Sequence, residues 1–121
     1  MTEIQNLKHY DLEERTFVFA KRVGAFCGRV LKTLENIEYR KQLVRSSGSV
    51  AANYIEANEA LSKKDFVMRI KICRKEAKES ELWLRLTILN DNGALEDERA
   101  ALIQEAIELR KIFGSILEKS K

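Results

Sequence analysis

The 121-residue sequence predicts an all-α fold, an up-down-up-down four-helix bundle, and three observations indicate this class. The chain contains no proline and only five glycines, so it offers few turns between long elements. Hydrophobic residues make up 45% and charged residues 34%, which is too much apolar content for a disordered chain. Apolar residues also recur at helical spacing in four segments. We expect one domain over residues 1–121, with helices at about 11–35, 39–58, 63–90 and 95–118.

The first helix is predicted from apolar residues three, four or seven positions apart, a spacing that lines one helix face. These residues are Leu12, Phe19, Val23, Phe26, Val30 and Ile37. The second helix runs through Leu43, Val50 and Tyr54. Small residues fill its centre from Ser46 to Ala52, and small side chains allow a neighbouring backbone to approach closely. We expect close packing around Gly48, with a kink at this glycine as the alternative.

The third helix is predicted to follow a capping residue, Ser62, whose hydroxyl can accept a backbone hydrogen bond while Asp65 favours the positive helix end. Its inward seam consists of Phe66, Ile70, Cys73, Ala77, Ser80 and Leu84. We expect the segment from Asn90 to Gly93 to end this helix, because Asn and Gly tolerate the left-handed backbone conformation. The fourth helix runs through Leu102, Ala106, Leu109, Phe113 and Ile116.

A second apolar stripe follows the third helix, offset by two residues from the inward seam. Two residues correspond to about 200° of rotation, so this stripe faces away from the first. We expect it to contact another copy of the chain, with Trp83 beside it as an anchor. The interface candidates are Met68, Ile72, Leu82, Trp83, Leu86 and Leu89.

Basic residues recur every seven positions in two rows, although the net charge is only +3. The row on or before the first helix is Lys8, Arg15, Arg22 and Arg29, and the row on the third helix is Lys64, Lys71, Lys78 and Arg85. Residues 91–108 carry a compensating net charge of −5. Basic rows bind phosphate backbones through counterion release, so Arg15, Arg22, Arg29 and the third-helix row are nucleic-acid candidates. The alternative is pairing with acidic residues of a neighbouring helix or subunit.

The sequence contains no recognisable catalytic or metal-binding constellation. A di-iron bundle needs Glu-x-x-His pairs, and the only histidine, His9, precedes the first helix. Two Glu-x-x-Glu pairs occur, Glu56 with Glu59 and Glu76 with Glu79. We expect buried or interfacial ion pairs with arginines such as Arg40 and Arg45 rather than a metal site. We therefore expect no enzyme activity, no cofactor, no metal and no small-molecule substrate.

Two cysteines, Cys27 and Cys73, lie in apolar helical patterns without metal-ligand partners, and we expect reduced thiols in the core. A membrane span needs about 18 consecutive apolar residues, and the sequence has no such run. The N-terminal residues lack the apolar region of a secretion signal. We therefore expect a cytoplasmic protein without a membrane partner.

Three segments resemble a known family: Ser49–Ala57 (SVAANYIEA), Ser62–Phe66 (SKKDF) and Lys71–Leu84 (KICRKEAKESELWL). They are similar to bacterial four-helix bundle proteins encoded in intervening sequences of 23S ribosomal RNA genes. Ala57 stands where the family usually has glycine, and Tyr54-Ile55 replaces Ile-Ala. The residues that match the family motif are Asn53, Glu56, Glu76, Glu79 and Trp83.

The resemblance implies a left-handed bundle that assembles as a ring-shaped homopentamer, without known catalytic residues. It also implies kinship with accessory proteins of diversity-generating retroelements, which are basic pentamers that engage a reverse transcriptase and nucleic acid. The motif residues are then structural, at helix contacts within or between subunits. Our leading hypothesis is a non-enzymatic, homo-oligomeric bundle whose basic rows contact RNA or DNA. The alternative is a self-assembling or protein-binding scaffold whose basic rows pair with acids.

Overall fold

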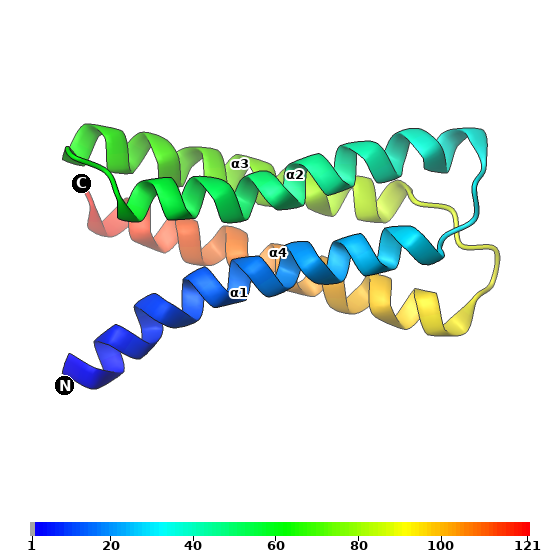
Figure 1. The fold of residues 1–121 in the computed structure, drawn as a ribbon, viewed down its shortest axis with the longest axis horizontal. Helices are drawn as coiled ribbons and strands as arrows, with labels where there is room; N and C mark the ends of the chain where they lie inside the picture. The colour runs from blue at the N-terminus through cyan, green and yellow to red at the C-terminus, as the bar shows by residue number, and fades with distance from the viewer. Residues whose placement is uncertain (1) are drawn as a thin grey trace.

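The computed structural model describes the backbone of residues 2–121 and the side chains of residues 12–121. Its helices are α1 (Thr2–Arg29), α2 (Leu34–Asn58), α3 (Lys63–Leu86) and α4 (Gly93–Lys119). Successive helices run in opposite directions, and the described residues contain no strand (Figure 1). The predicted all-α, up-and-down four-helix bundle is confirmed.

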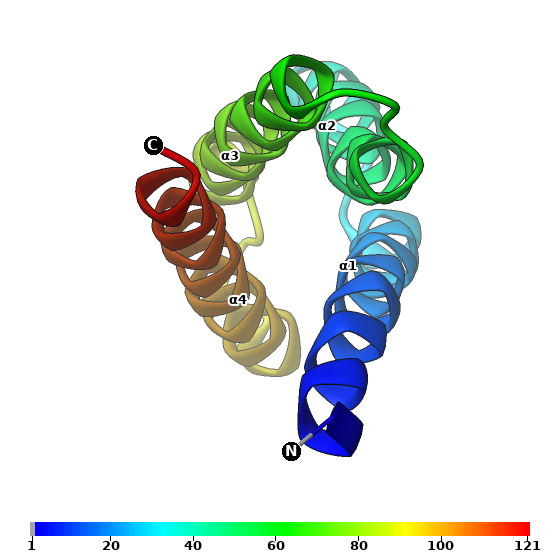
Figure 2. The ribbon, with the colours of Figure 1, turned by 90° about the vertical axis from the view of Figure 1, so that its left-hand side faces the viewer.

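The four helices form a ring in chain order, so that each contacts the two beside it (Figure 2). Contact is most extensive between α2 and α3 and least extensive between α1 and α4. This order places the acidic first half of α4 beside α1.

The core consists of the apolar residues that all four helices turn inward. Phe19 and Phe26 of α1 and Phe113 of α4 all belong to this core, and their side chains are almost fully buried. Burying one such side chain contributes about 1.5–3 kcal/mol. The predicted α1 positions up to Val30 and the α3 seam from Ile70 onward are buried, while Phe66 packs half-buried against the core.

The first link differs from its predicted position. α1 begins at Thr2 rather than near residue 11, because no proline or glycine interrupts residues 2–10, and it ends at Arg29 rather than near residue 35. Thr33 begins α2 earlier than expected, because its Oγ1 accepts a hydrogen bond from the Asn36 backbone N–H at 3.0 Å. Ile37, predicted to line the first helix, therefore lies on α2, where it is half-exposed.

The second link agrees with the sequence, whereas α3 ends earlier than predicted. Ser62 caps α3 through a 3.1 Å bond from the Asp65 N–H to its Oγ. α3 stops at Leu86 rather than near residue 90. Asn36, fully buried, accepts from the Ile88 N–H and donates through Nδ2 to the Leu31 and Ile88 carbonyls, each at 2.9 Å. These bonds satisfy backbone N–H and C=O groups that lie just beyond the helix ends. A further helical turn is therefore not required to satisfy them, and α3 can end at Leu86.

The structure contradicts the prediction for Gly93, and Gly48 itself makes no close contact among the described residues of one protomer. Asn90 (φ 49°) and Asp91 (φ 63°) take the left-handed conformation, and Asn92 caps α4, so Gly93 begins α4 instead of ending α3. A Cβ atom added at Gly48 would meet no heavy atom within 4 Å. Gly48 therefore does not mark close packing inside the bundle.

Candidate nucleic-acid interface

The α1 basic row is neutralised by α4. Arg15 Nε lies 2.7 Å from Glu105 Oε2, and its Nη2 lies 2.9 Å from Glu108 Oε1. Arg22 Nη2 lies 3.0 Å from Glu98 Oε1. The hydrogen bond with Glu105 raises the pKa of Arg15, and hydrogen bonds from Gln104 and then Arg15 lower the pKa of Glu108. The alternative of pairing with a neighbouring helix therefore holds for Arg15 and Arg22.

The other members of the α1 row differ from these two. Arg29 is exposed and has no ion-pair partner among the described side chains. Lys8 lies outside the residues whose side chains are described. The α1 row is thus not a continuous free basic surface.

The α3 row has the opposite environment. Lys64, Lys71, Lys78 and Arg85 are all exposed, as are Arg74 and Lys75 between them. None of the six forms an ion pair within the described part of the chain. We call these six residues the α3 basic face.

Neighbouring hollows follow the α3 basic face along the helix. One is lined by Lys63, Lys64, Val67, Met68 and Lys71. The next is lined by Lys71, Arg74, Lys75, Lys78 and Arg110, the last of these from α4. A third is lined by Lys75, Lys78, Glu79, Glu81, Leu82 and Arg85. The basic side chains therefore surround depressions rather than standing on a flat helix surface.

The predicted apolar stripe of α3 divides into an exposed and a covered part. Met68, Leu82 and Leu86 are 44%, 47% and 42% exposed. Trp83 instead packs against the core, with its ring centroid 6.1 Å from that of Tyr39. Leu89 is buried in the core. It lies beyond the end of α3, so the helical spacing of the exposed stripe does not determine the direction of its side chain. The expectation that Leu89 contacts a second subunit is therefore corrected, whereas Trp83 and Ile72 are half-buried.

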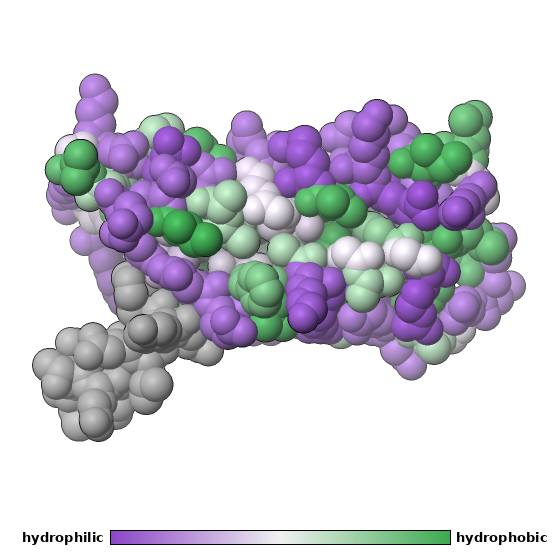
Figure 3. All heavy atoms as spheres, viewed as in Figure 1, coloured by the Kyte–Doolittle hydropathy of each residue, from purple (hydrophilic) through white to green (hydrophobic). Residues whose placement is uncertain are grey.

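Sequence reasoning missed an exposed apolar face on α2. Its members are Leu34, Ile37, Val44 and Ile55. Figure 3 shows apolar side chains interrupting the hydrophilic surface over α1 and α2. The three-, seven- and eleven-residue spacing between these positions was a usable signal, but the adjacent small residues suggested an inward face.

These surfaces occur on a chain whose family can be determined. The sequence profile of the 23S rRNA-intervening sequence proteins matches residues 8–115. The chain belongs to this family. The resemblance found in the three sequence segments is thereby confirmed.

A solved relative shows the same fold. It is the crystal structure of a protein with unknown function from the S23 ribosomal protein family of Bacteroides thetaiotaomicron. The two chains are 27% identical and superpose with a TM-score of 0.78, over 92% of this chain and 98% of the relative. No protein with a curated functional description matches the chain.

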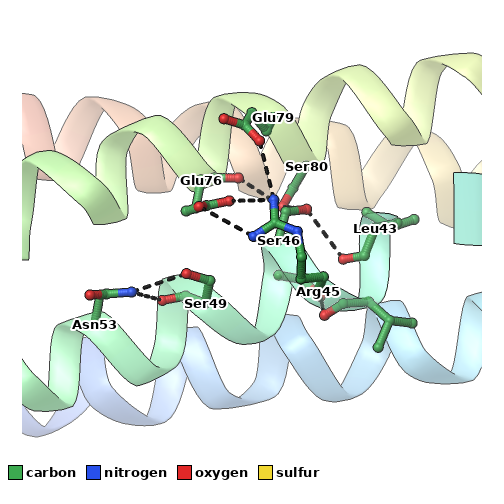
Figure 4. Close-up of polar contacts among 10 residues, drawn as sticks. Leu43, Arg45, Ser46, Ser49, Asn53, Glu76, Glu79 and Ser80 are labelled. Atoms are coloured by element: carbon green, nitrogen blue, oxygen red, sulfur yellow. Dashed lines mark hydrogen bonds and ion pairs between the residues drawn. The ribbon is translucent and has the colours of Figure 1, made fainter. Parts of the chain in front are cut away.

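Part of the family motif forms a polar contact between α2 and α3 (Figure 4). Arg45 Nη2 lies 3.1 Å from Glu76 Oε1 and 3.3 Å from Glu79 Oε1. Ser46 and Ser80 share a hydrogen bond of 2.8 Å between their hydroxyl oxygens. The predicted ion pairing is confirmed for Glu76 and Glu79.

The remaining motif residues have other environments. Asn53 donates to the Ser49 carbonyl at 2.9 Å and accepts from Arg69 at 3.0 Å. Glu56 and Glu59 are exposed and have no ion pair among the described residues, so a buried pair is not formed and an interfacial pair stays a prediction. Arg40, one of their predicted partners, donates to the Cys27 carbonyl instead.

Neither a metal cluster nor a reactive thiol is found in the described part of this family member. The described residues contain no group of three or more His, Cys, Asp or Glu side chains that could hold a metal ion. Cys27 and Cys73 are buried free thiols, as predicted, and burial raises their pKa to about 11 and about 12. Among the described residues, no helix has the length and apolar character to cross a membrane.

Proposed function

We propose that this protein is a non-enzymatic, homo-oligomeric four-helix bundle that binds RNA or DNA through the α3 basic face. The observation that carries the proposal is the difference in pairing between cations on different helices. Arg15 and Arg22 bind carboxylates of α4, whereas the six cations of the α3 basic face have no carboxylate partner among the described residues. Residues 63–78 carry a net charge of +5.

The physical reason is that phosphates supply the missing counter-charge. Cations three and four residues apart on one helix repel each other, as Lys71, Arg74, Lys75 and Lys78 do. A phosphate backbone relieves that repulsion, and binding releases the counterions condensed on the nucleic acid. The family names of this chain and of its solved relative both refer to ribosomal RNA or the ribosome, which supports RNA as the first ligand to test.

The self-association part of the proposal rests on the exposed apolar residues. Met68 and Leu86 lie about 60–80° around α3 from Lys71 and Lys78, on the side toward α2. A head-to-tail ring needs two different patches on each protomer, and the α2 apolar face supplies a second one. The family resemblance favours a pentamer. An assembly through Met68 and Leu86 leaves Lys71 and Lys78 accessible to nucleic acid.

The second candidate is a scaffold that binds protein but not nucleic acid. The observation that favours it is the ion pairing of Arg15 and Arg22, which shows that a basic row in this fold can be purely structural. In this case the α3 basic face pairs with acids of another subunit.

An electrophoretic mobility shift across a salt series tests the proposal. We expect the wild type to shift RNA or DNA at low salt, with a steep loss as salt rises. The variant Lys64→Glu/Lys71→Glu/Lys78→Glu is expected to abolish the shift. The control variant Lys32→Glu/Lys41→Glu/Lys111→Glu changes three other exposed lysines and is expected to retain binding, apart from a modest loss that follows from net charge.

Light scattering on the same variants tests the oligomer separately. We expect Met68→Glu/Leu86→Glu to lower the mass of the assembly and the lysine variants to leave it unchanged. Absence of a shift with any RNA or DNA at low salt would contradict nucleic-acid binding and leave the scaffold. Loss of the oligomer in the lysine variant would assign the α3 basic face to the subunit interface.

A further inference from the structure

The hollow between α3 and α4 combines basic residues from both helices. Lys71, Arg74, Lys75 and Lys78 come from α3, and Arg110 comes from α4. Among the described residues, no carboxylate lines it. Its volume is about 400 Å³, within the size range of small-ligand sites, about 300–1,000 Å³. We call it the five-cation hollow.

Spacing along α3 explains how four cations share this hollow. Successive positions are three, one and three residues apart, which keeps all four within about 100° of one side of the helix. Each is exposed and has no ion-pair partner among the described residues. Four like charges therefore lie close together without a paired carboxylate in the described part of the chain.

Arg110 makes the hollow a site with two walls. Its Nη2 lies 3.6 Å from Glu81 Oε1, and the Glu81 side chain is only 18% exposed. This pair holds the guanidinium beside the α3 lysines. Arg110 Nε is buried and has no hydrogen-bond partner among the described residues. Arginine is suited to phosphate because its donors form a planar fork, while lysines add point charges.

We propose that the five-cation hollow binds two or more adjacent phosphate groups and is the anchor point of the nucleic-acid interface, with Arg110 as a phosphate ligand. The inference rests on the proposed function and deepens it. It assigns a binding role to a residue of α4 and to one segment of the α3 basic face. Adjacent phosphates occur both in a nucleic-acid backbone and in a free polyphosphate, and the two sources require separate measurements.

Two probes distinguish the sources. Isothermal titration calorimetry with tripolyphosphate measures binding of free adjacent phosphates, and fluorescence anisotropy with a short labelled RNA measures backbone binding. We expect the wild type to bind both probes at low salt. Arg110→Gln is expected to weaken each affinity about tenfold, because it removes a charge-assisted hydrogen bond to phosphate.

Glu81→Gln is the matched control. It removes the same ion pair as Arg110→Gln but keeps the cation, so a purely structural role of the pair predicts equal losses in the two variants. We expect Glu81→Gln to bind both probes at least as tightly as the wild type. Thermal unfolding followed by circular dichroism shows whether each variant is folded.

The outcomes separate this inference from the proposed function. Suppose that Arg110→Gln binds as tightly as the wild type while the triple lysine variant loses RNA binding. This result would overturn the phosphate site in the five-cation hollow and would still support RNA binding by the α3 basic face. Equal losses of affinity in Arg110→Gln and Glu81→Gln would also overturn the proposed phosphate site in the five-cation hollow. Arg110-dependent binding of tripolyphosphate without RNA binding would support the phosphate site and overturn nucleic acid as its ligand. Binding of neither probe would overturn both proposals.

Discussion

The basic rows of α1 and α3 share a seven-residue repeat but differ in what lies opposite them. Arg15 and Arg22 face Glu98, Glu105 and Glu108 of α4, whereas the cations of the α3 basic face have no such partners among the described residues. The repeat places cations on one side of a helix, but the order of helices in the ring decides which residues they meet. Basic periodicity is therefore evidence for a ligand only where the neighbouring helix supplies no acids.

Substitution of Asn36 has the largest expected effect on stability, because this residue fixes the chain just beyond the ends of both α1 and α3. Asn36→Ala leaves the Leu31 carbonyl and the Ile88 N–H and carbonyl without their partner. Each buried unpaired group costs about 1–3 kcal/mol, so we expect a loss of roughly 3 kcal/mol. Urea unfolding measures it. Asn53→Ala is the control, with an expected loss near 1 kcal/mol, and equal losses would contradict a special role for Asn36.

Charge reversal tests the difference between the two rows directly. Arg15→Glu places a third carboxylate beside Glu105 and Glu108, and we expect it to lower the free energy of unfolding by about 2 kcal/mol. Lys71→Glu relieves repulsion with Arg74 and Lys75, so we expect no loss or a gain of a few tenths of a kcal/mol.

Urea unfolding at low and moderate salt measures both variants. The Arg15→Glu effect is expected to persist in salt in part, because Arg15 is only 29% and Glu105 only 18% exposed. A loss in Lys71→Glu as large as that in Arg15→Glu would show that the α3 cations are also structurally paired.

The smallest expected effect is the titration of Glu108. Hydrogen bonds from Gln104 and Arg15 lower its pKa in the folded state. Its contribution to stability is therefore present above the pKa of the unfolded chain, near 4.5, and is lost as pH falls through the lowered folded value. An NMR titration of the carboxyl group should show the pKa moving back toward 4.5 in Arg15→Gln and unchanged in Lys71→Gln. An unchanged value in Arg15→Gln would contradict the α1 to α4 pairing.

Much of the fold is predictable because it depends on local spacing. The buried seam of α3 follows from three- and four-residue steps, and the Ser62 cap follows from its sequence position. The link before α2 lies earlier than the sequence predicts, because Thr33 caps the helix and residues 30–33 contain neither glycine nor proline. The burial of Leu89 depends on where α3 ends, and Asn36, a residue distant in sequence, helps to set that end.

The candidate site was predictable only in part, because its two components have different origins. The basic row of α3 is visible as a repeat in the sequence. Its lack of acidic partners depends on which helices are neighbours. The position of Arg110, which lies on α4 and lines one hollow with Lys71 and Lys78, depends on the same arrangement. The same dependence on neighbours removed Arg15 and Arg22 from the free basic surface.

The most direct test of the proposed role of the α3 basic face is the salt dependence of RNA binding. Each phosphate contact contributes about 0.7–0.9 to the slope of log K against log salt. We expect Lys64→Gln/Lys71→Gln/Lys78→Gln to reduce the slope by roughly 2 relative to the wild type. The control Lys32→Gln/Lys41→Gln/Lys111→Gln is expected to leave it nearly unchanged. Equal slopes in the wild type and the α3 variant would show that RNA binds elsewhere or not at all, and would contradict the proposal.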